Sequence, residues 1–416
     1  MKKTLILIVI VGLAAPFARG QAEKTSSAFG IALSGYVKTD VFFDTRQTVN
    51  IREGHFLLYP KGPLADPDGN DISRRAGFNI LSIQTRLAAK ITGPDALGAK
   101  TSAYIEGEFF GTSDADVNGF RLRHAYLKLN WPTSELLIGQ FWHPMFITES
   151  YPDVVSFNTG APFQPFNRSP QIRYRHDFGA FSLIGTVVAQ RDFVSPGPDG
   201  PSSSYLRNGV LPELNLKAQV DVKNEAAGTE SLAGAGIDYL RLAPRLATAT
   251  GYTTDETVGG FAAMAYVKQR WPKLTVKAEG VYGRDLYHLT MLGGYAVDGT
   301  TDPERQYWDY TPIDVVSVWA EVQTNGAPWQ TGVFAGWSRN LGVRHAIDGL
   351  DFDRGFNIAE LYRVSPRLLY NVGKMRFAGE VEVTGAAYGA PNVFDKVTGA
   401  RFATNVRLLF AAYYFF

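Results

Sequence analysis

The sequence has no cysteine and almost no net charge, although it is 416 residues long. Without cysteine it can form no disulfide, no thiolate metal site and no thiol nucleophile. Its 41 basic and 40 acidic residues give a formal net charge of +1, so the basic excess that nucleic-acid binding needs is missing. What the chain does have is glycine, with 42 residues, and phenylalanine and tyrosine, with 27 and 20.

Long apolar runs are also missing after the N-terminus, since no later segment offers 18 uninterrupted apolar residues, and no spanning helix is predicted. The segment 1–20 has the pattern of a secretory signal peptide: two lysines, a short apolar run, and small residues at positions 18 and 20. A membrane anchor, the alternative, needs about 20 apolar residues. The sequence therefore predicts an exported bacterial protein with one domain over 21–416.

Apolar and polar residues alternate with a period of two through much of the chain. In 213–223, ELNLKAQVDVK, aliphatic residues alternate with charged and amide residues. The segment 79–92 repeats the pattern, with Leu81, Ile83 and Leu87 on one face. Such alternation is typical of a strand with one apolar face. These segments run to about 10 to 14 residues, which is long for a soluble sandwich and sufficient to cross a bilayer at a tilt.

Sixteen such strands are predicted, and their connections alternate in length. The strands are 33–44, 79–92, 99–111, 119–130, 134–142, 170–178, 180–192, 211–223, 231–243, 260–271, 273–284, 312–324, 328–340, 359–372, 374–386 and 400–416. Connections after even-numbered strands are short and most of the others are long, as in outer-membrane barrels with periplasmic turns and external loops. A spanning sheet has to close because lipid offers no hydrogen bonds. The predicted fold is an all-β, 16-stranded antiparallel transmembrane β-barrel.

The last predicted strand ends in AAYYFF, with Phe402, Leu408, Tyr414 and Phe416 on its apolar face. Here the sequence resembles the outer-membrane porins of Gram-negative bacteria. In that family a terminal strand ending in phenylalanine is read by the barrel-assembly machinery, which implies that Tyr414 and Phe416 are the assembly signal. The stretches FRLRHAYLKLNW and LLIGQFWHPMF, followed by a proline-rich loop, further resemble substrate-specific trimeric porins of the DcaP type, which implies a homotrimer.

A barrel of this size holds water, so its function depends on what narrows it. The loop 143–170 has five prolines, several aromatic residues and few charges, which favours packing inside the lumen over exposure to external water. In porins the third loop is the constriction loop, so the resemblance implies the same role. The alternative is a surface loop that packs on neighbouring loops or subunits.

Basic residues recur on the predicted inner faces of five strands: Lys38, Arg86, Lys90, Arg121, Arg123, Arg173, Arg175, Arg401 and Arg407. The loop 143–170 carries the carboxylates Glu149 and Asp153. A basic wall opposite acidic loop residues would set up a transverse field that favours anions, and guanidinium forks suit carboxylates and phosphates. The alternative is that these cations are solvated, or paired with Asp40, Glu106 and Glu108.

The strand 119–130 contains a conflict. Arg121 and Arg123 share their face with Leu127, so both arginines and the leucine would point into the lumen. A β-bulge near His124 would switch the faces and turn Tyr126 inward.

Enzyme and metal motifs are missing. The six histidines form no HExxH motif and no GxSxG elbow is present, so no enzymatic activity, not even that of a barrel phospholipase, and no cofactor is predicted. In DPDGNDIS, Asp66, Asp68 and Asn70 have the first three spacings of a Ca²⁺ loop, but the distal glutamate is missing. A surface turn is the favoured interpretation, and a weak Ca²⁺ or lipopolysaccharide-bridging site is the alternative.

Together these patterns predict an outer-membrane porin for passive diffusion of small hydrophilic solutes, with a preference for anions. Its expected partners are outer-membrane lipid, lipopolysaccharide, the assembly machinery and two further copies of the chain. The alternatives are a non-selective channel and a structural barrel that is plugged by its own loops within a larger envelope complex. A TonB-dependent receptor is excluded because it needs 22 strands and a plug domain.

Overall fold

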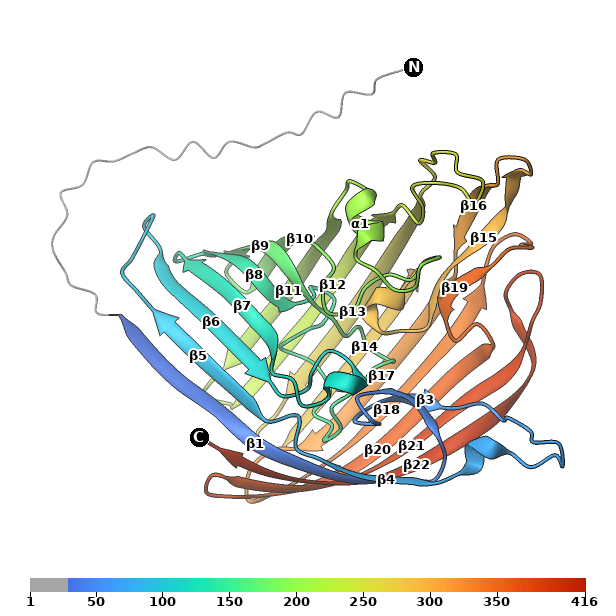
Figure 1. Cartoon of the computed structure of the whole chain (residues 1–416). Coiled ribbons are helices and arrows are strands. Elements are labelled where there is room, and N and C mark those ends of the chain that lie inside the picture. Colours follow the sequence, from blue (N-terminus) through green and yellow to red (C-terminus); the bar gives the residue numbers. More distant parts are fainter. Residues whose placement is uncertain (1–28) are drawn as a thin grey trace.

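A computed structural model describes residues 29–416 as one closed antiparallel barrel (Figure 1). The predicted signal peptide lies outside the described residues. The barrel strands are β1 (Gly30–Asp44), β4 (Gly77–Leu81), β5 (Arg86–Thr92), β6 (Lys100–Glu108), β7 (Arg121–Asn130), β8 (Ser134–Trp142), β9 (Arg168–Phe178), β10 (Phe181–Val188), β11 (Glu213–Asn224), β12 (Thr229–Leu242), β13 (Val258–Arg270), β14 (Leu274–Arg284), β17 (Asp314–Thr324), β18 (Trp329–Gly342), β20 (Ile358–Val372), β21 (Met375–Pro391) and β22 (Val397–Phe415).

These seventeen segments make sixteen barrel strands, because β4 and β5 both pair with β1 and form one interrupted strand. The ring closes where β1 pairs with β22, from Tyr36 opposite Phe415 to Asp44 opposite Arg407. The predicted 16-stranded barrel is therefore confirmed. No helix in the described part of the chain is long and apolar enough to cross a membrane.

The connections differ sharply between the two ends of the barrel. At one end, turns such as Gly179-Ala180 and Gly373-Lys374 join neighbouring strands directly. Gly179 and Gly373 have φ values of 72° and 57°, the positive φ that tight hairpin turns favour. At the other end, long loops carry β2 (Thr48–Ile51), β3 (Phe56–Pro60), η1 (Ile72–Arg74), η2 (Asp114–Asp116), α1 (Ser204–Asn208), η3 (Tyr287–Leu289), β15 (Gly293–Asp302), β16 (Tyr307–Pro312) and β19 (Asp351–Arg354). The short-turn end is the one expected in the periplasm.

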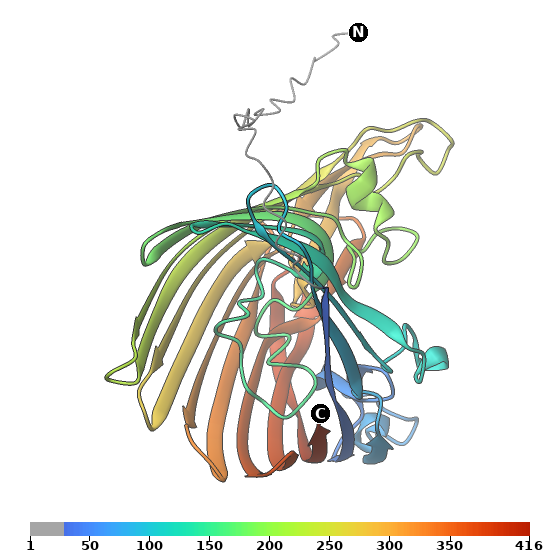
Figure 2. The ribbon, with the colours of Figure 1, turned by 90° about the vertical axis from the view of Figure 1, so that its left-hand side faces the viewer.

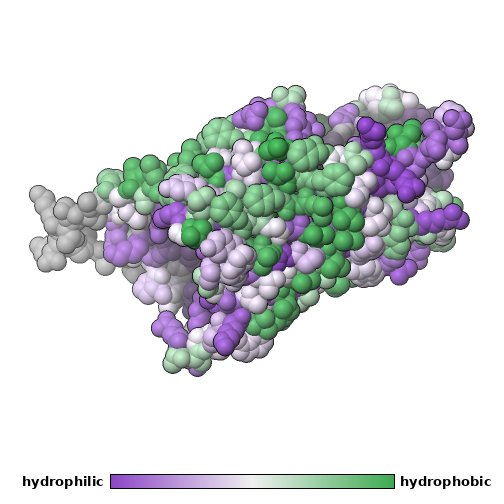
Figure 3. Space-filling view, turned by 90° about the horizontal axis from the view of Figure 1, so that it is seen from below, coloured by the Kyte–Doolittle hydropathy of each residue, from purple (hydrophilic) through white to green (hydrophobic). Residues whose placement is uncertain are grey.

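The outer surface of the barrel is apolar. On β22, Phe402, Leu408 and Phe410 are about half exposed, whereas Asn405 and Arg407 on the opposite face are buried. Tyr414 and Phe416 also lie on the outer face. Figure 3 shows apolar side chains gathered over the middle of one side of the molecule. Such a surface suits a bilayer and would be costly in water.

One predicted face is wrong. Leu81 and Ile83 are buried inside the barrel, whereas Leu87 points outward. The reason is a break between β4 and β5, where the Thr85 N–H donates to the carbonyl of Ser82 in a local turn. This turn changes the phase of the alternation, so that the outward residues of β4 are Phe78 and Ile80.

The conflict in the strand 119–130 is resolved by a bulge. Glu106 lies opposite His124, whereas its neighbour Gly107 lies opposite Leu122, so Arg123 is the extra residue on β7. A bulge puts two residues of one strand opposite one residue of the other and re-aims the side chains beyond it. Beyond the bulge the faces are consequently switched: Leu127 points outward and Tyr126 lines the lumen cavity, although Arg121 and Arg123 are both buried.

A charge on the outer surface should destabilise the barrel in proportion to its depth. We expect Val318→Arg, in the middle of β17, to lower the free energy of unfolding by about 2–4 kcal/mol. Leu274→Arg is the matched control at the first residue of the adjacent β14, and near the interface it should cost only about 0–1 kcal/mol. Tryptophan fluorescence during denaturant unfolding from liposomes measures both values. Equal costs at the two positions would contradict this membrane placement.

Candidate functional site

The segment between β8 and β9, residues 143–167, folds into the lumen of the barrel (Figure 2). It crosses to the opposite wall, where the Val155 N–H donates to Glu380 Oε2 at 2.6 Å and the Asp153 N–H to Glu321 Oε2 at 2.9 Å. Arg363 Nη1 also donates to the carbonyl of Ala161, at 2.7 Å. Wall side chains thus satisfy backbone groups of this segment, which we call the constriction loop.

Aromatic residues explain how the constriction loop keeps its shape. Trp142 stacks on Phe146 with ring centroids 3.9 Å apart, and Phe110 stacks on Phe157 at 4.1 Å. The hairpin of β2 and β3 from the first external loop joins this packing through Phe56, which is fully buried. Part of the lumen is consequently filled by an apolar core built from loops.

On the wall formed by β5, β6 and β7, buried arginines surround two glutamates. Glu108 accepts hydrogen bonds from Arg123 at 2.7 Å, Arg121 at 2.8 Å and Arg86 at 3.1 Å. Arg123 also binds Glu106, with its Nε 2.6 Å from Oε1. Removing one partner would leave a buried unpaired charge at a cost of several kcal/mol, so each arginine and glutamate of the network depends on the others for its stability.

The other predicted basic residues lie in several environments. Lys38 pairs with Asp40 at 2.9 Å and donates to the Val155 carbonyl at 3.1 Å. Arg407 pairs with Asp44 at 2.7 Å, and Arg175 with Asp177 at 2.7 Å. Arg173 donates to the Trp142 carbonyl, while Lys90 and Arg401 are exposed, away from the buried network. The wall is therefore largely a set of ion pairs, which is the alternative weighed for it above.

Within the described residues, the two acidic residues of the constriction loop make no ion pair with the arginine network. Asp153 lies 2.6 Å from Lys277 of β14 and accepts from Gln323 of β17. Glu149 accepts from the Thr148 hydroxyl at 2.9 Å. Burial opposes the charge on Glu149, but Lys217, the Thr148 hydroxyl and Arg173 together with a backbone N–H outweigh burial, and the pKa of the carboxyl is lowered. Asp153 thus anchors the loop to the wall formed by β14 and β17.

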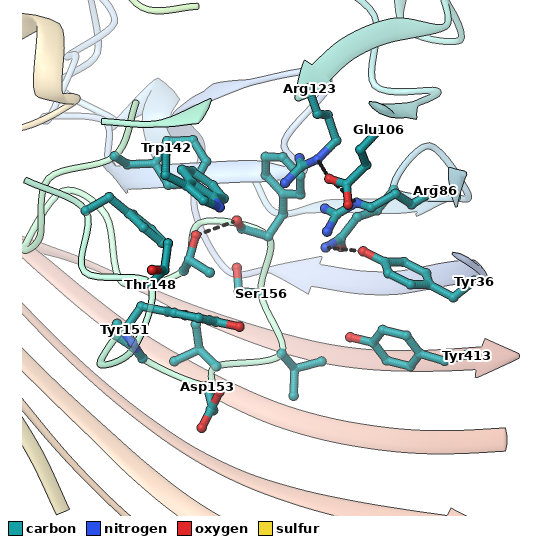
Figure 4. Close-up of a pocket in the computed structure, with 18 of the residues that line it drawn as sticks. Tyr36, Arg86, Glu106, Arg123, Trp142, Thr148, Tyr151, Asp153, Ser156 and Tyr413 are labelled. Atoms are coloured by element: carbon teal, nitrogen blue, oxygen red, sulfur yellow. Dashed lines mark hydrogen bonds and ion pairs between the residues drawn. The ribbon is translucent and has the colours of Figure 1, made fainter. Parts of the chain in front are cut away.

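A cavity of about 660 Å³ remains between the constriction loop and the arginine network (Figure 4). Arg86, Arg123 and Glu106 lie on one side of it, and Tyr151 and Asp153 of the loop on the other. Its charged lining consists of Arg86, Arg123, Arg367, Arg376, Glu106 and Asp153, four arginines against two carboxylates. The lining therefore has two more positive than negative groups.

Several residues of this site were not singled out from the sequence. Arg363 and Arg367 of β20 bind the constriction loop and Glu321, respectively. Arg376 at the start of β21 reaches the cavity, and its guanidinium lies 5.5 Å from the Phe415 ring. All three lie on inner faces that the alternation predicts, but the alternation alone does not tell which inner residues meet the loop.

The possible Ca²⁺ loop forms a compact surface turn. One carboxylate oxygen of Asp66 accepts from the N–H groups of Asp68 at 3.0 Å and Asn70 at 2.8 Å. This geometry is that of an Asx turn. A Ca²⁺ site there stays a prediction.

Known proteins provide an independent comparison. No family model matches the sequence, and no curated protein matches it. Among solved structures, the outer membrane channel DcaP of Acinetobacter baumannii superposes with a TM-score of 0.68 at 18% identity, covering 95% of this chain and 99% of DcaP. This chain has the fold of the outer-membrane porins. An anion-selective porin from Comamonas acidovorans gives a TM-score of 0.53 at 10% identity, covering 94% and 100%. OmpT of Vibrio cholerae gives a TM-score of 0.51 at 13% identity, covering 94% of this chain and 99% of OmpT.

The arginine network should be sensitive to loss of Asp192, which lies after β10 and binds Arg168 at 2.6 Å and Arg121 at 3.1 Å. Burial opposes its charge, but Arg168 and Arg121 more than offset it, so the pKa of Asp192 is lowered. A lowered pKa means that the pair stabilises the fold above the unfolded pKa of about 3.9 and stops doing so as the pH falls through the folded pKa. We expect Asp192→Asn to lower the free energy of unfolding by about 3 kcal/mol at pH 7.

The difference in the free energy of unfolding between wild type and Asp192→Asn should shrink below about pH 4, because the side chain at position 192 is then uncharged in both proteins. Denaturant midpoints measured from pH 7 to pH 3 check this. Asp95→Asn removes an exposed pair with Lys100 and is the control without effect. A difference that stays constant with pH would show that packing, and not charge, is what the substitution removes.

Proposed function

We propose that this protein is an outer-membrane channel for passive diffusion of small hydrophilic solutes, with a preference for small anions such as carboxylates and phosphate-like groups. The observation that carries the proposal is the cavity beside the constriction loop, inside a closed barrel of porin fold. A lumen narrowed to a polar, charged cavity selects solutes by size and charge. The proposal includes no enzymatic activity.

The anion preference rests on the charge of the cavity. Arg86 and Arg123 share Glu106 and Glu108, and Arg367 pairs with Glu321. Arg376 makes no ion pair within the described residues and donates its Nε to the Asn371 amide oxygen at 2.8 Å. The rest of its guanidinium fork remains available to a carboxylate or phosphate, which is the geometry such forks bind best.

A homotrimer is part of the proposal. OmpT of Vibrio cholerae, a structural neighbour at a TM-score of 0.52, was solved in a trimer form. On this chain an apolar groove of about 630 Å³ follows the seam between β1, β4, β20, β21 and β22, with Phe43, Phe78 and Phe410 in its walls. Lipid and lipopolysaccharide would cover the remaining outer surface. The assembly machinery would read Tyr414 and Phe416, and Asp66, Asp68 and Asn70 would at most bridge lipopolysaccharide through Ca²⁺.

A plugged structural barrel is the second candidate. The observation that favours it is the apolar core inside the lumen, where Phe56 of the first external loop packs against Phe157 and Phe166 of the constriction loop. A core of this kind excludes water and so narrows any passage. The Arg376 side of the lumen favours the channel instead, because a sealed barrel would need no cations facing a cavity.

Conductance in a planar bilayer separates the two candidates. For the channel we expect stepwise openings in groups of three and, in a salt gradient, a reversal potential of the sign that anion flow gives. Heat-modified gel mobility of the same sample verifies that the barrel is folded. A folded protein that leaves the bilayer silent would contradict the channel and favour the plugged barrel.

Arg376→Gln tests the origin of the selectivity. The substitution removes the lining arginine that makes no ion pair within the described residues, so we expect the anion-to-cation permeability ratio to fall by roughly half, with single-channel conductance changed less than about two-fold. Arg401→Gln removes an exposed arginine of β22 that does not line the cavity. It should leave the reversal potential unchanged. An equal shift in both variants would assign selectivity to overall charge and not to the cavity.

A further inference from the structure

Four buried side chains from four separate segments converge at the start of the constriction loop. They are His143 at the start of the loop, Glu213 of β11, Asp238 of β12 and His288 of η3, and we call them the histidine–carboxylate cluster. One ligand atom from each lies within 4.8 Å of the others, and every member is buried. No short sequence motif connects them, because their separations along the chain are 25 residues or more.

The cluster is organised around one oxygen. His143 Nε2 lies 2.7 Å and His288 Nε2 2.9 Å from Glu213 Oε1. Asn215 lies opposite Asp238 in the ladder between β11 and β12 and donates to its Oδ1 at 3.0 Å. This amide holds the Asp238 carboxylate in place, in the way that outer-sphere partners orient metal ligands.

The chemistry of the cluster suits a cation. Two carboxylates and two imidazoles are buried together, and a buried charged group needs a charged or hydrogen-bonding partner. The second oxygen of Glu213, Oε2, is buried and has no hydrogen-bond partner within the described residues. It is thus an unused acceptor inside the cluster and a second reason, beside the spacing, to expect a ligand.

We propose that the histidine–carboxylate cluster binds one divalent first-row transition metal, with Zn²⁺ as the best match. Zn²⁺ takes imidazole nitrogen and carboxylate oxygen at about 2.0–2.2 Å in tetrahedral sites, which spaces ligand atoms by about 3.3 Å. The observed spacings, from 2.7 Å up to 4.8 Å, bracket that value. Ca²⁺ and Mg²⁺ prefer all-oxygen sites. Two carboxylates and one dication also bring the net charge to zero.

Binding changes the protonation of His143. The Met145 N–H donates to His143 Nδ1 at 3.3 Å, so without a metal the ring proton is on Nε2 and is shared with Glu213. A metal bound at Nε2 would displace this proton to Nδ1 of the same ring. The hydrogen bonds to Glu213 and from Met145 would then be exchanged for one metal–nitrogen bond.

The site would clamp the constriction loop at its base. The segment that carries His288 already holds the far end of the loop, since the Phe166 N–H donates to the Leu289 carbonyl at 2.8 Å and Asn167 Nδ2 to the His288 carbonyl at 2.8 Å. A metal shared by His143 and His288 ties the near end to the same segment and to the barrel wall. Both ends of the loop then move only together.

Metal content and spectroscopy test the proposal on the folded barrel in detergent, independently of conduction. Metal is first removed with a chelator and gel filtration, and Zn²⁺ is then added. We expect one equivalent of Zn²⁺ per chain to stay bound through a second gel filtration. Co²⁺ should give visible absorption typical of four-coordinate nitrogen and oxygen ligation. Zn²⁺ should also raise the midpoint of the heat-induced mobility shift by several degrees, because it binds the folded state alone.

Asp238→Asn and His288→Gln keep the side-chain shape, and each should lose the bound equivalent, the Co²⁺ spectrum and the thermal shift. His345→Gln is the control, because this exposed histidine pairs with Asp298 away from the cluster. Wild-type protein that retains no metal, or metal lost equally from His345→Gln, would overturn the site. Since wild type is compared with and without Zn²⁺, poor folding of a variant does not decide the result. A silent bilayer with one Zn²⁺ bound would refute the channel and leave the metal site standing.

Discussion

Closure of the backbone hydrogen-bond ring is the constraint on which the rest of this structure depends. Lipid offers no partners to an open sheet edge, so the pairing of β1 with β22 is required before any strand can remain in a membrane. Closure also separates two environments. One face of every strand meets an apolar exterior, and the other faces a lumen in which charged groups can persist only with partners.

That second condition shapes the lumen. The inner faces carry many charges, and the constriction loop supplies hydrogen-bonding partners to several of them. Glu380 accepts two N–H groups of the loop, and Arg363 donates to loop and hairpin carbonyls. The charged wall residues and the irregular loop thus stabilise each other. The loop has backbone N–H and C=O groups without partners in secondary structure, and the buried charged side chains of the wall form hydrogen bonds with them. Aromatic packing between two loops then fixes the position of this assembly.

The proposed function follows from what this arrangement leaves open. Most of the predicted basic wall is used in ion pairs, whereas Arg376 of the cavity lining makes none within the described residues. The η3 segment, which holds the end of the constriction loop, also supplies His288 to the histidine–carboxylate cluster at the start of the loop. The proposed selectivity and the proposed metal site therefore depend on different groups, and substitutions can separate them.

The sequence by itself determined the barrel, the number of strands, and the outer face of most of them, because the period of two is local and a lipid exterior enforces it. It also singled out Arg86, Arg123 and the constriction loop, but not Arg363, Arg367 or Arg376. The sequence predicted the wrong inner and outer faces for part of 79–92, where a turn shifts the phase of the alternation. It left undecided whether a β-bulge interrupts the strand near Arg123. Only the tertiary structure decided which inner charges pair. It also decided that Asp153 binds Lys277, that Glu149 lies near Lys217, and that His143 contacts His288. These are contacts across the lumen between residues far apart in the chain, and no local periodicity encodes them.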